Sequence, residues 1–96
     1  MLYHISYHFY DENAPDESFF DMLDEISDGS VQLGFDGCLL IDVACEPKGL
    51  EAYFAPYFTH RLDRYIITPF VRGRSRCKVT EREQKFLKTH WHKVPK

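Results

Sequence analysis

The chain has 96 residues, of which 44% are hydrophobic and 16% aromatic, and its formal net charge is −3. This length predicts one domain with a modest core, and no apolar run reaches the roughly 20 residues that a membrane span needs. The three cysteines lack a Cys-x-x-Cys spacing, which argues against a disulfide framework or a zinc knuckle. Because no signal peptide is visible either, the sequence predicts a cytoplasmic protein without membrane contact.

Acidic and basic residues are separated along the chain. Residues 1–55 carry twelve of the fifteen Asp and Glu and a single cation, Lys48, which gives a charge near −11. Residues 56–96 carry eleven of the twelve Lys and Arg and three acids, which gives a charge near +8. Such charge asymmetry is informative about binding partners rather than about the fold. We therefore expect the two parts to contact each other, within a monomer or across a dimer, or the basic part to contact an acidic partner.

A strand is expected over residues 2–10, where apolar and more polar side chains alternate. Its apolar side consists of Tyr3, Ile5, Tyr7 and Phe9. After a loop, apolar residues recur from Phe19 onward at the spacing of a helix, with Asp16 and Glu17 placed where the helix dipole favours anions. The pair Asp28-Gly29 is expected to end this helix.

Two more strands and a second helix are expected next. Residues 31–35 alternate, residues 38–45 are almost continuously apolar as in a central strand, and Asp36-Gly37 between them is a hairpin signal. Pro47 is expected to begin a helix, which Pro56 should kink or restart. The expected inner stripe of this helix is Leu50, Tyr53, Phe54, Tyr57 and Phe58.

Residues 64–71 predict a fourth strand, in which Pro69 is typical of a sheet edge or a strand end. The order strand, helix, strand, strand, helix, strand is that of the ferredoxin-like fold. This is an α+β architecture in which two helices cover one face of an antiparallel sheet. We expect a single domain, with a core over residues 1–71 and a basic C-terminal extension over residues 72–96.

Within the extension, residues 72–79 alternate cations with small or apolar residues, which fits a fifth strand or a loop. Thr80 and Glu83 have the spacing of a capping box and predict a short helix through about Trp91. In an extended segment, His90 and His92 would lie on one side, roughly 6–7 Å apart. Zinc would need further ligands, so a loosely ordered tail is the simpler interpretation.

Four short segments carry a resemblance to a known family, namely residues 3–8, 35–42, 54–58 and 63–67. On these segments the chain resembles, over about residues 2–71, the small ferredoxin-like CRISPR-associated endoribonucleases and their stand-alone SinR-like relatives. The resemblance implies the same fold and a homodimer. It further implies that a strand after the core, here residues 72–79, completes the sheet of the partner.

The resemblance also implies a divalent metal at the end of the first strand, bound by one aspartate from each subunit. At the matching place this chain has His8, and an aspartate follows only at Asp11. His8 and Asp11 are therefore the candidate catalytic residues of a ribonuclease that needs magnesium or manganese. A polar strand face is the simpler interpretation of His4 and His8, which lie roughly 13 Å apart along a strand and cannot share a metal.

Two charged surfaces are candidates for contact with partners. Cations neutralise phosphates and aromatic rings stack on unpaired bases, so the basic candidate surface is Arg72, Arg74, Arg76, Lys78, Arg82, Lys85, Lys88 and Trp91. A solvated surface, or one paired with the acidic part of a second copy, is the alternative. The acidic candidate surface, expected along the first helix, is Asp21, Asp24, Glu25 and Asp28.

These observations favour a non-enzymatic binding module, homodimeric and without a cofactor, that contacts a protein or nucleic acid through its basic C-terminal segment. One alternative is the metal-dependent endoribonuclease. Another is a phage-encoded inhibitor of a bacterial defence system that acts through the acidic surface. The absence of a glycine-rich phosphate loop or a His-Glu-x-x-His motif weighs against an enzyme.

Overall fold

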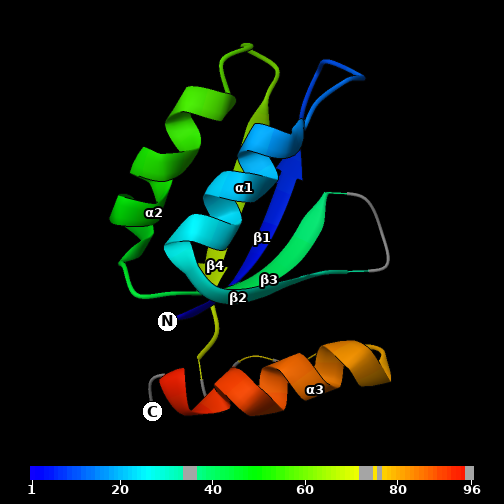
Figure 1. Ribbon diagram of the computed structural model, residues 1–96, viewed down its shortest axis with the longest axis vertical. Helices are drawn as coiled ribbons and strands as arrows, with labels where there is room; N and C mark the ends of the chain where they lie inside the picture. The colour runs from blue at the N-terminus through cyan, green and yellow to red at the C-terminus, as the bar shows by residue number, and fades with distance from the viewer. Residues whose placement is uncertain (34–36, 72–74, 76, 95–96) are drawn as a thin grey trace.

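The computed structural model describes residues 1–33, 37–71, 75 and 77–94. It is a small α+β structure with one four-stranded antiparallel sheet and three α-helices (Figure 1). The strands are β1 (Leu2–His8), β2 (Ser27–Gln32), β3 (Cys38–Val43) and β4 (Arg64–Pro69), and the helices are α1 (Glu17–Ile26), α2 (Pro47–Phe54) and α3 (Glu81–His90). Two short 3-10 turns, Ala55–Tyr57 and Trp91–Lys93, follow α2 and α3.

The strands lie in the order β2-β3-β1-β4, so β1 and β3 are central and β2 and β4 are the edges. β1 pairs antiparallel with both β3 and β4, and His4, for example, lies opposite Leu40 on one side and Thr68 on the other. The predicted central position of the apolar run from Cys38 is therefore confirmed. The edge position predicted for Pro69 is confirmed too, because β4 has only one neighbour.

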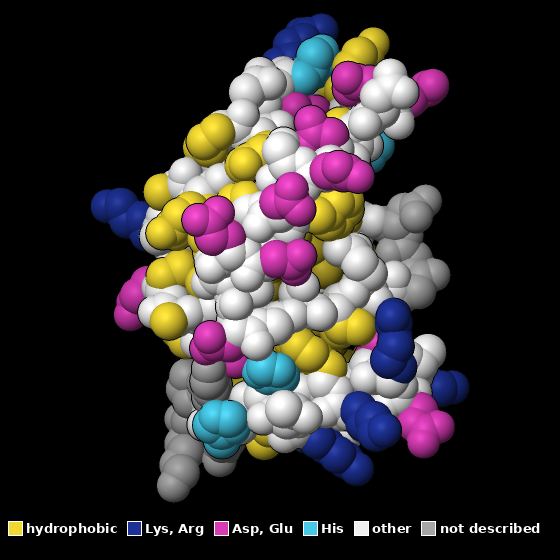
Figure 2. All heavy atoms as spheres, in the orientation of Figure 1, with side chains coloured by type: hydrophobic (Ala, Val, Ile, Leu, Met, Phe, Trp, Pro, Cys, Tyr) yellow, Lys and Arg dark blue, Asp and Glu magenta, His cyan; other side chains and the backbone are white. Residues whose placement is uncertain are grey.

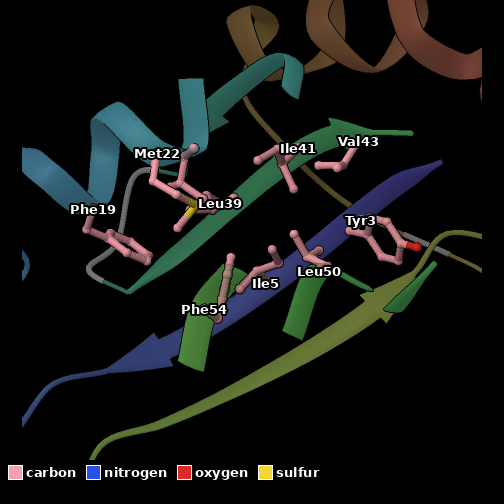
Figure 3. Packing of buried hydrophobic residues seen from close by; sticks show 10 residues of the cluster. Tyr3, Ile5, Phe19, Met22, Leu39, Ile41, Val43, Leu50 and Phe54 are labelled. Atoms are coloured by element: carbon pink, nitrogen blue, oxygen red, sulfur yellow. The ribbon is translucent and has the colours of Figure 1, made fainter. Parts of the chain in front are cut away.

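The first face of the sheet is covered by α1 and α2, which lie side by side in Figure 1. Alternate residues of β1 and β3 point into the core formed there, as expected for a strand period of two. Figure 3 shows how the side chains of this first core meet. Its buried members are Tyr3, Ile5, Phe19, Met22, Leu23, Leu39, Ile41, Val43, Leu50 and Phe54.

The ends of α1 and α2 follow mostly from local chemistry. The carboxylate of Asp16 accepts hydrogen bonds from the backbone N–H groups of Ser18 and Phe19 at 3.1 and 3.3 Å, and thus caps α1. Hydrogen bonds from the Ser18 side chain and these N–H groups lower the pKa of Asp16. Pro47 opens α2, as predicted. The helix gives way at Ala55 to a 3-10 turn that contains Pro56.

Two expectations for these helices are wrong. Asp28-Gly29 does not end α1 but lies inside β2, where the pairing with β3 shifts register between Ser27 and Gly29. Tyr53 does not belong to an inner stripe but is 49% exposed. Within the eight-residue α2, only Leu50 and Phe54 are buried. They are four residues apart and therefore lie on the same side of the helix, the side that faces the sheet.

The second face of the sheet is covered at one end by α3. Strand residues that point away from the first core meet the apolar side of this helix and the turn after it. The buried members of this second core are Leu2, Leu40, Phe70, Leu87 and Val94, with Val31, Leu33, Val79 and Phe86 packed against them. The predicted capping box is confirmed: Thr80 and Glu83 exchange side chain to backbone hydrogen bonds at the start of α3.

The extended arrangement considered for His90 and His92 is wrong, because His90 is the last residue of α3 and His92 lies in the following 3-10 turn. The segment 72–79 was expected to be a fifth strand or a loop, and its described residues, Ser75 and 77–79, have no regular secondary structure. The rest of that segment and the tip of the hairpin at Asp36 lie outside the described residues.

We predict that α3 stabilises the whole domain through Leu87, whose side chain is 3% exposed. Leu87→Ala should lower the free energy of unfolding by about 2–5 kcal/mol, because it removes buried methyl groups and leaves a cavity. Lys88→Ala, at the neighbouring exposed position, should change it by less than about 0.5 kcal/mol. Urea denaturation followed by circular dichroism measures both. Equal midpoints for the two variants would contradict the prediction.

Candidate functional site

The outer side of α3 carries most of the described cations of the basic candidate surface. Because the apolar side of the helix faces the sheet, its polar residues face solvent at helical spacing. Figure 2 shows Lys and Arg gathered around α3 and carboxylates gathered over α1. We call the exposed set Lys78, Arg82, Lys85 and Lys88 the basic surface.

The charges of the basic surface are available to a partner. Within the parts of the chain that the structure describes, none of these four cations lies within 4.0 Å of a carboxylate oxygen. The guanidinium of Arg82 donates a hydrogen bond to the carbonyl oxygen of Gln32 at 2.9 Å, which ties the start of α3 to the end of β2. Arg72, Arg74 and Arg76 lie outside the described residues.

A cavity of about 510 Å³ opens between the second face of the sheet and the start of α3. We call it the α3 cavity. Its walls combine apolar side chains with a few polar groups, which is typical of small-molecule sites. The lining residues are His4, Leu33, Leu40, Thr68, Pro69, Phe70, Ser75, Cys77, Lys78, Val79 and Glu83.

A second hollow of about 530 Å³ lies farther along α3. It is lined by Ser75, Cys77, Gln84, Leu87, Lys88 and Trp91. Ser75 and Cys77 line both spaces, so the two hollows adjoin each other. Trp91 is 36% exposed and meets the ring of Phe70 edge-on, at 6.3 Å between centroids. Each hollow thus has one lysine of the basic surface in its wall, Lys78 in the first and Lys88 in the second.

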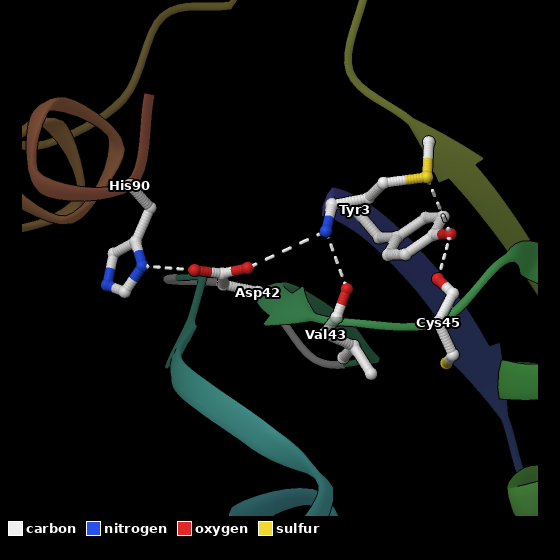
Figure 4. A network of polar contacts seen from close by, with 6 residues as sticks. Tyr3, Asp42, Val43, Cys45 and His90 are labelled. Carbon is white, nitrogen blue, oxygen red and sulfur yellow. Dashed lines mark hydrogen bonds and ion pairs between the residues drawn. The ribbon is translucent and has the colours of Figure 1, made fainter. Parts of the chain in front are cut away.

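The far end of α3 is held by a buried acid–imidazole pair (Figure 4). His90 Nδ1 lies 2.6 Å from Asp42 Oδ2, within hydrogen-bond distance, and Asp42 is fully buried on β3. The amino group of Met1 lies 3.8 Å from the other oxygen of Asp42. The ring of Phe86 packs on the His90 ring at 4.4 Å between centroids. This pair fixes the end of α3 that is opposite to the capping box.

Gly29 makes room for this pair. A Cβ atom at Gly29 would lie 3.2 Å from two ring atoms of His90, and the φ angle of +156° is one that glycine adopts most easily. Sequence reasoning missed the pair. The available signal was an aspartate inside the central run Leu39–Val43, because a carboxylate in the middle of a covered strand needs a partner.

The candidate catalytic residues are both exposed. His8 ends β1 and lies opposite Arg64 in the sheet, whereas the carboxylate of Asp11 accepts a hydrogen bond from the backbone of Asn13 at 2.9 Å. No group of three or more His, Cys, Asp or Glu side chains that could hold a metal ion occurs among the described residues.

The acidic candidate surface is divided between two elements. Asp21, Asp24 and Glu25 are exposed on α1, whereas Asp28 is exposed on β2. The acidic candidate surface thus includes residues of α1 and of the edge strand β2, and Figure 2 shows carboxylates gathered over α1.

A further carboxylate, Asp63, joins the end of β1 to the start of β4. It accepts hydrogen bonds from the backbone N–H groups of Tyr10 at 2.8 Å and His60 at 2.9 Å, and the rings of Tyr10 and His60 stack at 4.1 Å. The pKa of Asp63 is lowered, mainly by the hydrogen bond from the backbone of Tyr10.

No family model, curated protein or solved structure matches the chain. Among the described residues, no helix is both long and apolar enough to cross a membrane.

We predict that His90 stabilises the docked position of α3. His90→Ala removes a hydrogen-bonding partner from the buried carboxylate of Asp42 and should cost about 1–3 kcal/mol of unfolding free energy. His92→Ala, at an exposed position two residues away, should cost less than about 0.5 kcal/mol. Hydrogen exchange of the α3 amides should become faster in the first variant only. Unchanged exchange in His90→Ala would show that the pair does not hold the helix.

The pKa of Asp63 predicts a dependence of stability on pH. Because the folded pKa of Asp63 lies below the ordinary value of an aspartate, the ionised carboxylate contributes stability above the unfolded pKa of about 3.9. That contribution is lost as the pH falls through the lower folded pKa. Urea midpoints measured between pH 6 and pH 2 should therefore fall less steeply for Asp63→Asn than for the unaltered protein. Parallel curves would contradict this assignment.

Proposed function

We propose that the sheet, α1 and α2 form a ferredoxin-like fold. The element order β1-α1-β2-β3-α2-β4 and the placement of α1 and α2 in one core support this assignment. The strand order, in which β1 lies between β3 and β4, is compatible with it. α3 is then an addition to the basic pattern, and it covers part of the face that the other two helices leave open.

We further propose that the protein is a non-enzymatic binding module whose ligand is a single-stranded nucleic acid bound along α3. The observation that carries this proposal is the alternation of cations and hollows. Lys78 and Lys88 each adjoin a hollow with apolar walls. A single strand presents phosphates, which cations neutralise, and unpaired bases, which need apolar or aromatic surfaces to pack against.

A single strand fits this surface better than a duplex does. Bases inside a duplex are stacked and paired, so they cannot enter the two hollows unless they are extruded. Trp91 is 36% exposed and lines the second hollow, so it supplies an aromatic ring of the kind on which unpaired bases stack. The carboxylates over α1 repel phosphates and confine the strand to the α3 side of the molecule.

The basic surface is small, and this sets the expected strength of binding. Each phosphate neutralised on a single strand contributes about −0.7 to the slope of log K against log salt concentration. The four described cations by themselves therefore predict a slope of about −3. Phosphate contacts of this kind are weak at high salt and do not themselves distinguish one base from another.

The arrangement of His8 and Asp11 gives the ribonuclease alternative less support. Both side chains are exposed, and the carboxylate of Asp11 is engaged within its own turn by Asn13. A two-subunit metal site would require the partner to bring a second carboxylate to the end of β1. The homodimer, the ribonuclease and the defence inhibitor therefore stay predictions from the sequence.

We predict that replacing Lys85 and Lys88 together by Gln weakens binding of a labelled nine-nucleotide RNA. The loss of two cations should reduce the salt slope by about 1.4 and should lower affinity at low salt about equally for all base sequences. Lys48→Gln, an exposed lysine of α2, is the matched control and should leave the slope unchanged. Fluorescence anisotropy at several salt concentrations measures both quantities.

Three outcomes would contradict this proposal. The first is an absence of salt-dependent binding to single strands, and the second is an equal effect of Lys48→Gln. The third is a salt-sensitive self-association, seen in sedimentation velocity without nucleic acid, that the double variant abolishes. That result would assign the basic surface to the acidic surface of a second copy.

A further inference from the structure

The lining of the α3 cavity includes one acidic residue, Glu83, next to the basic surface. Glu83 is 4% exposed, yet it lines the cavity together with Lys78. Phosphate binding alone does not account for this, because a carboxylate repels phosphate. The capping box explains why a Glu or Gln stands at this position, but Gln would serve the cap without the charge.

We propose that the α3 cavity receives one unpaired base of the bound strand, and that Glu83 selects a base with an exocyclic amino group. Cytosine is then preferred over uracil. This inference rests on the proposed binding of single-stranded nucleic acid and specifies the base that the same site reads. The two pyrimidines have the same ring size, and they differ where cytosine has an amino donor and uracil a carbonyl acceptor.

The volume and the lining of the cavity suit a base. A space of about 510 Å³ lies within the range of small-molecule sites. Leu40, Phe70 and Val79 provide apolar walls for the flat faces of a ring. Thr68 supplies a hydroxyl group, and His4 lies opposite it in the β1–β4 pair. These groups come from elements that the sheet and the second core hold in fixed positions.

The carboxylate of Glu83 is held in place before any ligand binds. Its Oε1 accepts a hydrogen bond from the backbone of Thr80 at 3.0 Å, and the Thr80 hydroxyl accepts one from the backbone of Glu83 at 3.4 Å. An ionised carboxylate has about four acceptor positions, so one bond to Thr80 leaves capacity for an amino group. A carboxylate that accepts from the cytosine amino group is an established mode of base recognition.

In the proposed site, Lys78 and Glu83 contact different parts of the nucleotide. Lys78 is exposed in the wall of the cavity, where its ammonium group can meet the phosphate of the inserted nucleotide. The carbonyl group of uracil at the position of the amino group would face the carboxylate of Glu83, which offers no donor. In the second hollow the corresponding polar residue is Gln84, whose amide both donates and accepts, so that hollow has no such preference.

Glu83→Gln tests the inference with little disturbance of the fold, because Gln also forms a capping box. The unaltered protein should bind a nine-nucleotide cytidine RNA about tenfold more tightly than the corresponding uridine RNA, as one charge-assisted hydrogen bond provides. In Glu83→Gln this ratio should fall below about threefold. Glu81→Gln makes the same charge change in the same turn but at an exposed residue outside the cavity lining. This control should keep the tenfold ratio.

A second measurement uses the unaltered protein with free cytidine and uridine monophosphate. In ¹⁵N-correlated NMR spectra, the cytidine nucleotide should shift the amide signals of Thr68 and Val79 at lower concentrations than the uridine nucleotide does. This titration does not depend on strand binding or on a variant that folds. Equal response to both nucleotides, or no response to either, would overturn the inference.

The two proposals fail in different ways. If the protein binds both RNAs with equal affinity, or Glu83→Gln keeps the cytidine preference, the base inference is overturned while strand binding stands. If no RNA binds but the nucleotide titration still favours cytidine, the cavity is a nucleotide site and the strand proposal fails. If neither the RNAs nor the nucleotides bind, both proposals fail.

Discussion

The docking of α3 on the second face of the sheet is the constraint on which the other features depend. A strand with a period of two presents side chains to both faces of a sheet, and β1 is apolar on one face at Tyr3 and Ile5 and on the other at Leu2. α1 and α2 cover the first of these faces. Leu87 and Val94, on and just after α3, close the second core. Because the apolar side of α3 is used in this contact, its cations face solvent.

Polar interactions define the two ends of α3. At the start of α3, the capping box of Thr80 and Glu83 fixes the residue at which the helix begins. At its end, His90 meets the buried carboxylate of Asp42. Hydrophobic contacts alone are not directional, whereas a buried carboxylate requires its partner at one place. The pair of His90 and Asp42 therefore positions the far end of α3 on the sheet.

In this arrangement the charges that are separated along the sequence are also separated in space. The acids of the first part gather over α1 and the described cations of the second part gather around α3 (Figure 2). An anionic ligand is therefore directed to one side of the molecule, where hollows adjoin Lys78 and Lys88. Of the two acids in the first turn of α3, Glu81 is exposed and Glu83 is buried beside the cavity, which is why the proposed selection of a base is assigned to Glu83.

The sequence by itself determined what depends on local periodicity and turn chemistry. It predicted β1, β3, β4, the start of α2, the edge position of Pro69 and the capping box of α3, because each depends on residues that are close in the sequence. The second strand was expected over residues 31–35, whereas β2 is Ser27–Gln32. Only the tertiary structure decided the pairing of Asp42 with His90, the burial of Val94 and the α3 cavity. These features join residues from β1, β3, β4 and α3 that are far apart in the sequence. A local pattern indicates that a carboxylate or an apolar side chain needs a partner. Which residue becomes that partner depends on how the whole chain packs.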